Sequence, residues 1–119
     1  MGQRIVIALG GNALQANPKD ISSDAQLKTV IETAKTIVDL IKEDYEVIIV
    51  HGNGPQVGQI VSVYEKAENT PNMPFPECGA MSQGYIGYHL QQSIGEEMRK
   101  RGIHKGIAAV VTQVLVDKD

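Results

Sequence analysis

Two short glycine–asparagine segments contain the residues of this sequence that are best suited to chemistry. The first comprises Gly10, Gly11 and Asn12, and the second comprises Gly52, Asn53 and Gly54. Glycine has no Cβ and tolerates positive φ, so a ligand can approach its backbone and successive N–H groups can surround an anion. Asparagine adds N–H donors without a competing negative charge. A helix that begins at Pro55 would add the partial positive charge of its N-terminus. Both segments are therefore predicted to bind an anion.

Neither segment alone identifies a ligand, because a glycine pair is also common where a strand turns into a loop. The chain contains neither the Gly-x-x-x-x-Gly-Lys-Ser/Thr phosphate loop nor the Gly-x-Gly-x-x-Gly dinucleotide fingerprint. A nucleotide, if one binds, is therefore expected to be held by a different device.

Strands are expected to position both segments, since each segment follows a continuous apolar run. Residues 5–9 and 47–50 are rich in β-branched side chains and are predicted to be strands buried on both faces, which is typical of parallel sheets. Residues 107–116 form a third apolar run and are predicted to be a third strand. Ligands of open α/β sheets bind beyond the carboxyl ends of the strands. The two segments are thus expected to face one cleft.

Three helices are predicted between these strands, over residues 23–43, 56–67 and 77–100. Ser23 and Gln26 form a capping box at the start of the first helix, whose apolar residues recur every three or four positions. Strands that alternate with helices predict an α/β fold with a parallel sheet and right-handed crossovers.

The last predicted helix is unusual in its glycines, and it should end at Gly102. Glycine lowers helix propensity, so its presence inside a helix indicates close approach of another backbone. We therefore expect a tight packing seam or a subunit contact at three positions, which are Gly84, Gly87 and Gly95.

The composition is that of an acidic globular protein. The formal net charge is −3 and no basic run is present, which argues against nucleic-acid binding. No apolar stretch approaches the roughly 20 residues of a membrane span, and the first apolar run is too short for a signal peptide. Cys78 is the single cysteine, and a buried inert thiol is a better interpretation of it than a nucleophile. These features predict a cytoplasmic protein.

Four segments together resemble the carbamate kinases of the amino-acid kinase superfamily, and the resemblance covers nearly the whole chain. They are residues 8–14, 51–58, 78–87 and 110–117. Asn53 is the specific feature, since related acetylglutamate-type kinases usually carry a third glycine there. The resemblance implies a three-layer αβα sandwich with a mainly parallel sheet, of which this chain is the N-terminal part. Residues 1–119 would then be a partial domain that binds the phosphoryl acceptor, and the nucleotide-binding half would lie outside this sequence.

The resemblance also implies reversible phosphoryl transfer between ATP and carbamate, with ADP and carbamoyl phosphate as the other pair. In arginine catabolism the reaction would produce ATP. The implied catalytic residues are Gly11, Asn12 and Asn53, and the implied substrate- and phosphate-binding residues are Gly10, Gly11, Asn12, Gly52, Asn53 and Gly54. ATP or ADP and Mg²⁺ are implied as cofactors, no metal ligand is assigned within this chain, and a homodimer is the implied assembly.

Neither loop contains a lysine, although phosphoryl transfer normally requires full positive charges. The catalytic lysines are therefore expected outside residues 1–119, and the 119-residue chain alone is predicted to be inactive. Two alternatives remain: a truncated, non-catalytic anion-binding or regulatory module, and another small-molecule kinase of the same superfamily. His51 is interpreted as a structural residue that fixes its loop, because carbamate is already ionised and needs no general base.

Overall fold

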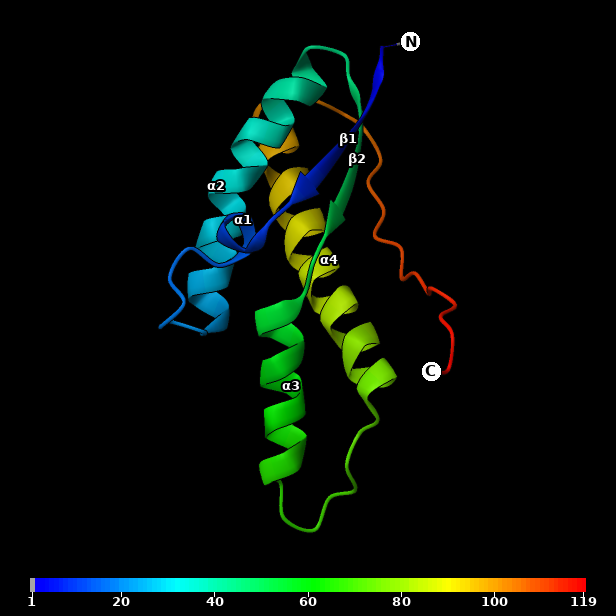
Figure 1. Ribbon diagram of the computed structural model, residues 1–119. Coiled ribbons are helices and arrows are strands. Elements are labelled where there is room, and N and C mark those ends of the chain that lie inside the picture. Colours follow the sequence, from blue (N-terminus) through cyan, green and yellow to red (C-terminus); the bar gives the residue numbers. More distant parts are fainter. Residues whose placement is uncertain (1) are drawn as a thin grey trace.

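Two parallel strands and the helices that connect them form the framework of the chain (Figure 1), as described by a computed structural model for residues 2–119. The elements are β1 (Arg4–Leu9), α1 (Gly11–Leu14), α2 (Ser23–Lys42), β2 (Glu46–His51), α3 (Gly54–Lys66) and α4 (Phe75–Lys100). The strands pair in parallel, from Arg4 opposite Glu46 to Leu9 opposite His51. The predicted α/β class, the parallel pairing and the three long helices are confirmed.

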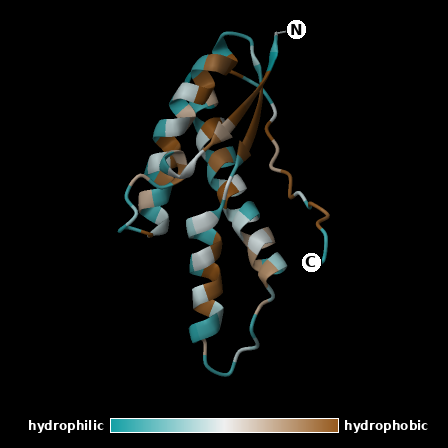
Figure 2. Ribbon diagram, viewed as in Figure 1, coloured by the Kyte–Doolittle hydropathy of each residue, from teal (hydrophilic) through white to brown (hydrophobic). Residues whose placement is uncertain are grey.

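Helices α2 and α4 cover one face of the sheet and form the core with it. The predicted apolar stripe of α2 is buried, and a second stripe on α4 meets it; the buried members are Val30, Ala34, Ile37, Val38, Ile86, Leu90, Ile94 and Met98. Ile7, Val47 and Ile49 of the strands pack against this cluster. Figure 2 shows hydrophobic residues along both strands and along the helical surfaces that face them. The core therefore lies on the helical side of the sheet.

The opposite face of the sheet is exposed, so the prediction that both faces are buried was wrong. Val6, Ile48 and Val50 expose 63%, 46% and 48% of their surface. Because strand side chains alternate between faces, the pair Val6 and Ile48 lies on the outer face, whereas Ile7 and Ile49 face the helices. The apolar runs are continuous because the outer positions are apolar too, but the described chain places a helical layer on one face only.

The N-terminal cap of α2 is one residue earlier than the predicted capping box. The Ser22 hydroxyl, not that of Ser23, accepts a hydrogen bond from the Ala25 N–H at 3.2 Å. Asp20 fixes this position because its Oδ1 accepts from the Ser22 N–H at 3.1 Å. The predicted partner Gln26 is buried instead, and its Nε2 donates to the Ile21 carbonyl at 3.1 Å. The helix start was predicted correctly, but its capping side chain was not.

Helix α4 ends as predicted, with Gly102 in the left-handed region at φ +69°. Its internal glycines behave differently from one another. A Cβ on Gly87 would lie 2.9 Å from the Cβ of Ala109, so this glycine does permit close approach of another segment. A Cβ on Gly84 or Gly95 would meet nothing within 4 Å. The tight seam is therefore confirmed at Gly87, within this chain.

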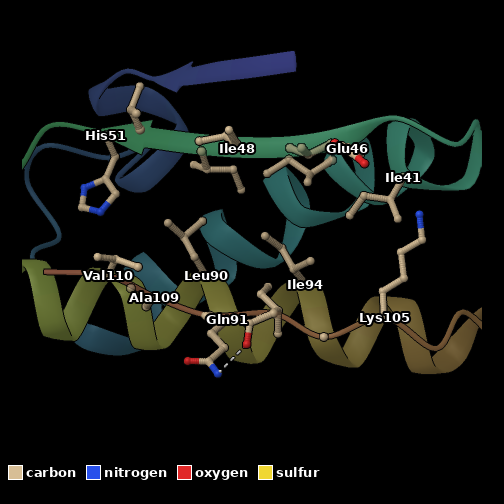
Figure 3. A pocket seen from close by; sticks show the side chains of 18 of the residues that line it. Ile41, Glu46, Ile48, His51, Leu90, Gln91, Ile94, Lys105, Ala109 and Val110 are labelled. Carbon is tan, nitrogen blue, oxygen red and sulfur yellow. Dashed lines mark hydrogen bonds between the residues drawn. The ribbon is translucent and has the colours of Figure 1, made fainter. Parts of the chain in front are cut away.

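The predicted third strand is not formed, and residues 103–119 contain no helix or strand. Two side chains of α4 take the backbone bonds that a strand partner would provide. Gln83 donates to the Thr112 carbonyl at 3.1 Å and accepts from the Thr112 N–H at 2.8 Å, and Gln91 donates to the Ile107 carbonyl at 3.3 Å. A largely apolar cavity of about 600 Å³ lies between this segment, α4 and β2. In Figure 3, Leu90 and Ile94 point from α4 toward β2 across that space.

Within residues 2–119, every helix is too short or too polar to cross a bilayer.

Candidate functional site

Both glycine–asparagine loops leave the sheet at the same edge. Leu9 and His51 are the last residues of β1 and β2, and they lie opposite each other in the parallel register. Gly10 and Gly52 follow them directly. The predicted common location of the two loops at the carboxyl edge therefore follows from the pairing itself.

The glycines of the loops provide space and not unusual backbone angles. Gly10 has φ −80°, and Gly102 is the one glycine of residues 2–119 with positive φ. A Cβ at Gly10, Gly11, Gly52 or Gly54 would meet nothing within 4 Å. All four of these glycines are exposed. Each glycine thus leaves open a volume that a side chain would otherwise fill.

The first loop leads into the single turn α1, which is fixed to α2. The Ala13 N–H donates to the Gly10 carbonyl at 3.1 Å, and no side chain caps the turn. The N–H groups of Gly11 and Asn12 precede this bond and have no acceptor within the turn. The Thr33 hydroxyl of α2 donates to the Ala13 carbonyl at 2.8 Å. The Asn12 side chain is exposed.

The second loop leads into α3, whose N-terminal donors are also uncapped. Asn53 is the N-cap residue, and its carbonyl accepts from the Val57 N–H at 2.8 Å. Asparagine commonly caps a helix with its side chain, but the Asn53 side chain makes no such bond. The N–H groups of Gly54 and Gln56 therefore have no intrahelical acceptor, and Pro55 has no N–H. As predicted, Pro55 lies in the first turn of the helix.

The Asn53 carboxamide is instead bound to α4. Its Nδ2 donates to the Ser82 hydroxyl at 2.8 Å, and that hydroxyl donates to the Gly79 carbonyl at 2.6 Å. Ser82 is completely buried. The sequence reasoning missed Ser82, because 29 residues separate it from Asn53 and nothing in the local pattern marks a serine inside a helix as a loop contact.

A buried polar cluster lies behind the start of α3 and joins three helices. The Gln26 Oε1 of α2 accepts from the Tyr85 hydroxyl of α4 and, at 3.5 Å, from the Gln56 Nε2 of α3. Gln26 and Gln56 are each only 2% exposed. Burial raises the pKa of Tyr85, an effect that the hydrogen bond to Gln26 partly offsets. The cluster fixes the first turn of α3 relative to the two core helices.

His51 lies at the boundary between the loop and the apolar cavity. Its Nδ1 is 2.9 Å from the Gly52 carbonyl oxygen, which agrees with the predicted role of fixing the loop. Figure 3 shows the ring pointing from the end of β2 toward the space lined by Leu90 and Val110. The residues that line this cavity do not include the glycines or asparagines of the two loops. The cavity is therefore distinct from the candidate anion site.

Cys78 and a metal site are the remaining candidates. Cys78 is fully buried as a free thiol, and its Sγ is 3.6 Å from the Met73 carbonyl oxygen, as expected for an inert packing residue. Among residues 2–119, no group of three His, Cys, Asp or Glu side chains could hold a metal ion. The loops offer backbone N–H groups and carboxamides, not the carboxylates that Mg²⁺ prefers, so their residues do not fit a Mg²⁺ site.

The arrangement is suited to holding a small anion. Two loops at one sheet edge present uncapped N–H groups, the N-terminus of a 13-residue helix and two carboxamides, without a carboxylate in either loop. Such donors stabilise negative charge on oxygen, including charge that develops in a transition state. Full positive charge is absent from both loops.

Comparison with known proteins relates this arrangement to enzymes. The family model described as the amino acid kinase family matches residues 3–115. Carbamate kinase of Clostridium perfringens is 54% identical over 120 residues, which cover 98% of this chain and 38% of that protein. Carbamate kinase of Pyrococcus furiosus is 46% identical over 122 residues, which cover 100% of this chain and 39% of that protein.

The solved structures show the same similarity in three dimensions. Carbamate kinase from Giardia lamblia bound to AMP-PNP superposes with a TM-score of 0.93 at 40% sequence identity, over 98% of this chain and 41% of that chain. The chain thus spans about two-fifths of the length of the relatives that it matches.

Proposed function

Because the chain belongs to the amino acid kinase family, we propose that it forms the acceptor-binding part of a carbamate kinase. The reaction is the reversible transfer of a phosphoryl group between carbamoyl phosphate and ADP, which gives carbamate and ATP. The observation that carries this proposal is the parallel register that ends with Leu9 opposite His51. This register supports a single anion site made from both loops.

In this proposal the two loops hold carbamate and the phosphoryl oxygens. The N–H groups of the first loop, at Gly10, Gly11 and Asn12, and those of the second, at Gly52, Asn53 and Gly54, donate to these oxygens. The Asn12 and Asn53 carboxamides orient them for in-line transfer. Phosphoryl transfer relies on positioning and charge stabilisation and requires no covalent intermediate, so uncapped donors suit it. Gly11, Asn12 and Asn53 are the proposed catalytic residues.

The nucleotide and the full positive charges are proposed to come from residues outside this chain. Neither loop contains a lysine, and the loop residues do not fit Mg²⁺. We therefore propose that ATP or ADP, Mg²⁺ and the catalytic lysines bind or belong to a second half, and that residues 1–119 are a partial domain. The coverage of about 38% of the Clostridium perfringens enzyme supports this division.

We propose that the protein forms a homodimer, lies in the cytoplasm and serves arginine catabolism. The outward surface of α4 supports the dimer, because Tyr88 is 61% exposed and Met81 is 37% exposed there. Cys78 is a buried free thiol, which suits a reducing compartment.

A truncated, non-catalytic anion-binding module is the second candidate, because both loops offer donors for an anion and neither contains a lysine. An assay of ATP formation from carbamoyl phosphate and ADP separates the two. The 119-residue chain alone should show no turnover. A chimaera that joins residues 1–119 to the remaining part of the Clostridium perfringens enzyme should be active.

Two controls decide how the result is interpreted. The unmodified Clostridium perfringens enzyme gives the reference rate, and binding of AMP-PNP to the chimaera reports that its second half is folded. A chimaera that binds AMP-PNP but does not turn over would favour the non-catalytic module. Turnover by the 119-residue chain alone would overturn the proposed division of the site.

A further inference from the structure

Ser82 links the second loop to the buried surface of α4. Its side chain is completely buried, and its hydroxyl donates one hydrogen bond and accepts another. The hydroxyl donates to the Gly79 carbonyl at 2.6 Å and accepts from the Asn53 Nδ2 at 2.8 Å. A carbonyl oxygen can only accept, so the single hydroxyl proton of Ser82 is committed to Gly79.

This direction selects one orientation of the Asn53 carboxamide. The Ser82 oxygen can only accept on the side that faces Asn53. If the carboxamide rotated by half a turn, its Oδ1 would face that oxygen, and two acceptors would meet without a proton between them. A buried acceptor without a donor is destabilising, because it loses its hydrogen bonds to water and gains none in return. The two orientations are therefore unequal, and Nδ2 faces Ser82.

We propose that Ser82 is a positioning residue that fixes the Asn53 carboxamide for the acceptor site. One Nδ2 proton is held by Ser82, so Asn53 presents its second N–H and its Oδ1 to a ligand, where two donors were expected from the sequence. This role rests on the proposed function, but the orientation itself does not. Ser82 acts through Asn53 and does not touch the reacting atoms.

The side-chain amide signals of Asn53 in the ¹⁵N-labelled 119-residue chain test the orientation without a ligand. Ser82→Ala should shift both Nδ2 proton signals, and Ser82→Thr, which keeps the hydroxyl, should restore them. Ser93→Ala is the matched control, because Ser93 is a buried serine of the same helix whose Oγ has no hydrogen-bond partner. Unchanged Asn53 signals in Ser82→Ala, or an equal shift in Ser93→Ala, would overturn the proposal.

The unsubstituted chain provides a second test that does not depend on a variant that folds. One Nδ2 proton of Asn53 should show a nuclear Overhauser contact to the Ser82 Hβ protons, as the 2.8 Å donor–acceptor distance requires. That contact supports the proposal, and its absence from a folded chain contradicts it.

Titration with carbamoyl phosphate separates this proposal from the proposed function. If both hold, the unsubstituted chain binds the ligand at the loop amides, and Ser82→Ala binds it about fivefold more weakly, the equivalent of one ordinary hydrogen bond. Equal affinity in Ser82→Ala would contradict positioning for the ligand. Failure of the unsubstituted chain to bind would count against the acceptor site, whereas the ligand-free signals would still decide the orientation of Asn53.

Discussion

The two glycine–asparagine loops share composition and place but differ in how they are held. The first loop is fixed through its backbone, since Thr33 of α2 binds the Ala13 carbonyl while Asn12 remains exposed. The second loop is fixed through its side chain, since Asn53 is bound by Ser82 of α4. The asparagine of the first loop is thus free to adapt to a ligand, and that of the second is preorganised.

This difference shows that equal motifs need not have equal roles. A preorganised donor requires no reorganisation when charge develops, whereas a mobile donor must be ordered first. We therefore expect Asn53 to define the geometry of the acceptor site and Asn12 to close on the ligand. The predictions below would break or refine this comparison.

The largest effect is expected where a side chain fills the anion site that we propose the two loops share. Gly52→Val and Gly11→Val should each lower turnover of the chimaera on the order of 100-fold, because misplacement of the reactants by about 1 Å has that effect. Gly58→Val is the matched control, since a Cβ there also meets nothing within 4 Å and the position lies on α3 beyond the loop. If the substitution in only one of the loops greatly lowered turnover, the two loops would not share a ligand.

An intermediate effect is expected on stability when each asparagine is removed. Asn53→Ala should lower the free energy of unfolding by about 1 kcal/mol, because it removes the hydrogen bond to buried Ser82. Asn12→Ala removes an exposed side chain and should change it by less than about 0.5 kcal/mol. Urea denaturation of the 119-residue chain measures both. Equal losses would remove the distinction between the loops.

The smallest effect is expected from pH, through the helix that holds the second loop. His89 of α4 is buried, its ring packs edge-on against Tyr85 with centroids 4.9 Å apart, and the Tyr88 ring lies 6.0 Å from it. Burial lowers the pKa of His89 in the folded chain. The unfolded chain then binds more protons below the ordinary histidine pKa of about 6.5. The free energy of unfolding should therefore be constant above that pH and decrease as the pH falls toward the lowered pKa.

His89→Gln should reduce this pH dependence, and the same substitution at the exposed His104 serves as its control. Denaturation midpoints between pH 5 and 7.5 measure the effect. In ¹⁵N NMR spectra of the same samples, the amide signals of the second loop should change at a higher pH than those of the first as the pH is lowered. A simultaneous change in both loops would contradict the separate anchoring that we infer.

Much of the fold was predictable because local patterns carry it. The apolar runs predicted β1 and β2, and the stripe of α2 predicted the buried face of that helix. The predicted amino-acid-kinase-like fold of an N-terminal part is confirmed by the TM-score of 0.93 with the Giardia enzyme. The third strand failed because a valine-rich run cannot reveal that Gln83 and Gln91 will bind its backbone.

The residues of the candidate site were predictable from the sequence, but the contacts that hold them in place were not. Glycine and asparagine at two strand ends are visible in the sequence, and the parallel pairing brings them to one edge. The roles of Gly11, Asn12 and Asn53 remain predictions. The Ser82 contact and the uncapped state of α3 depend on where α4 lies, which no local pattern encodes.

The sequence by itself determined the two loops, the strands that carry them and the helices between, because hydrophobic period and glycine placement act over a few residues. Only the tertiary structure decided which loop is preorganised, which sheet face is covered and where residues 103–119 lie. These outcomes depend on hydrogen bonds and packing between residues far apart in the chain. These hydrogen bonds and packing contacts form only when α2 and α4 pack against the sheet.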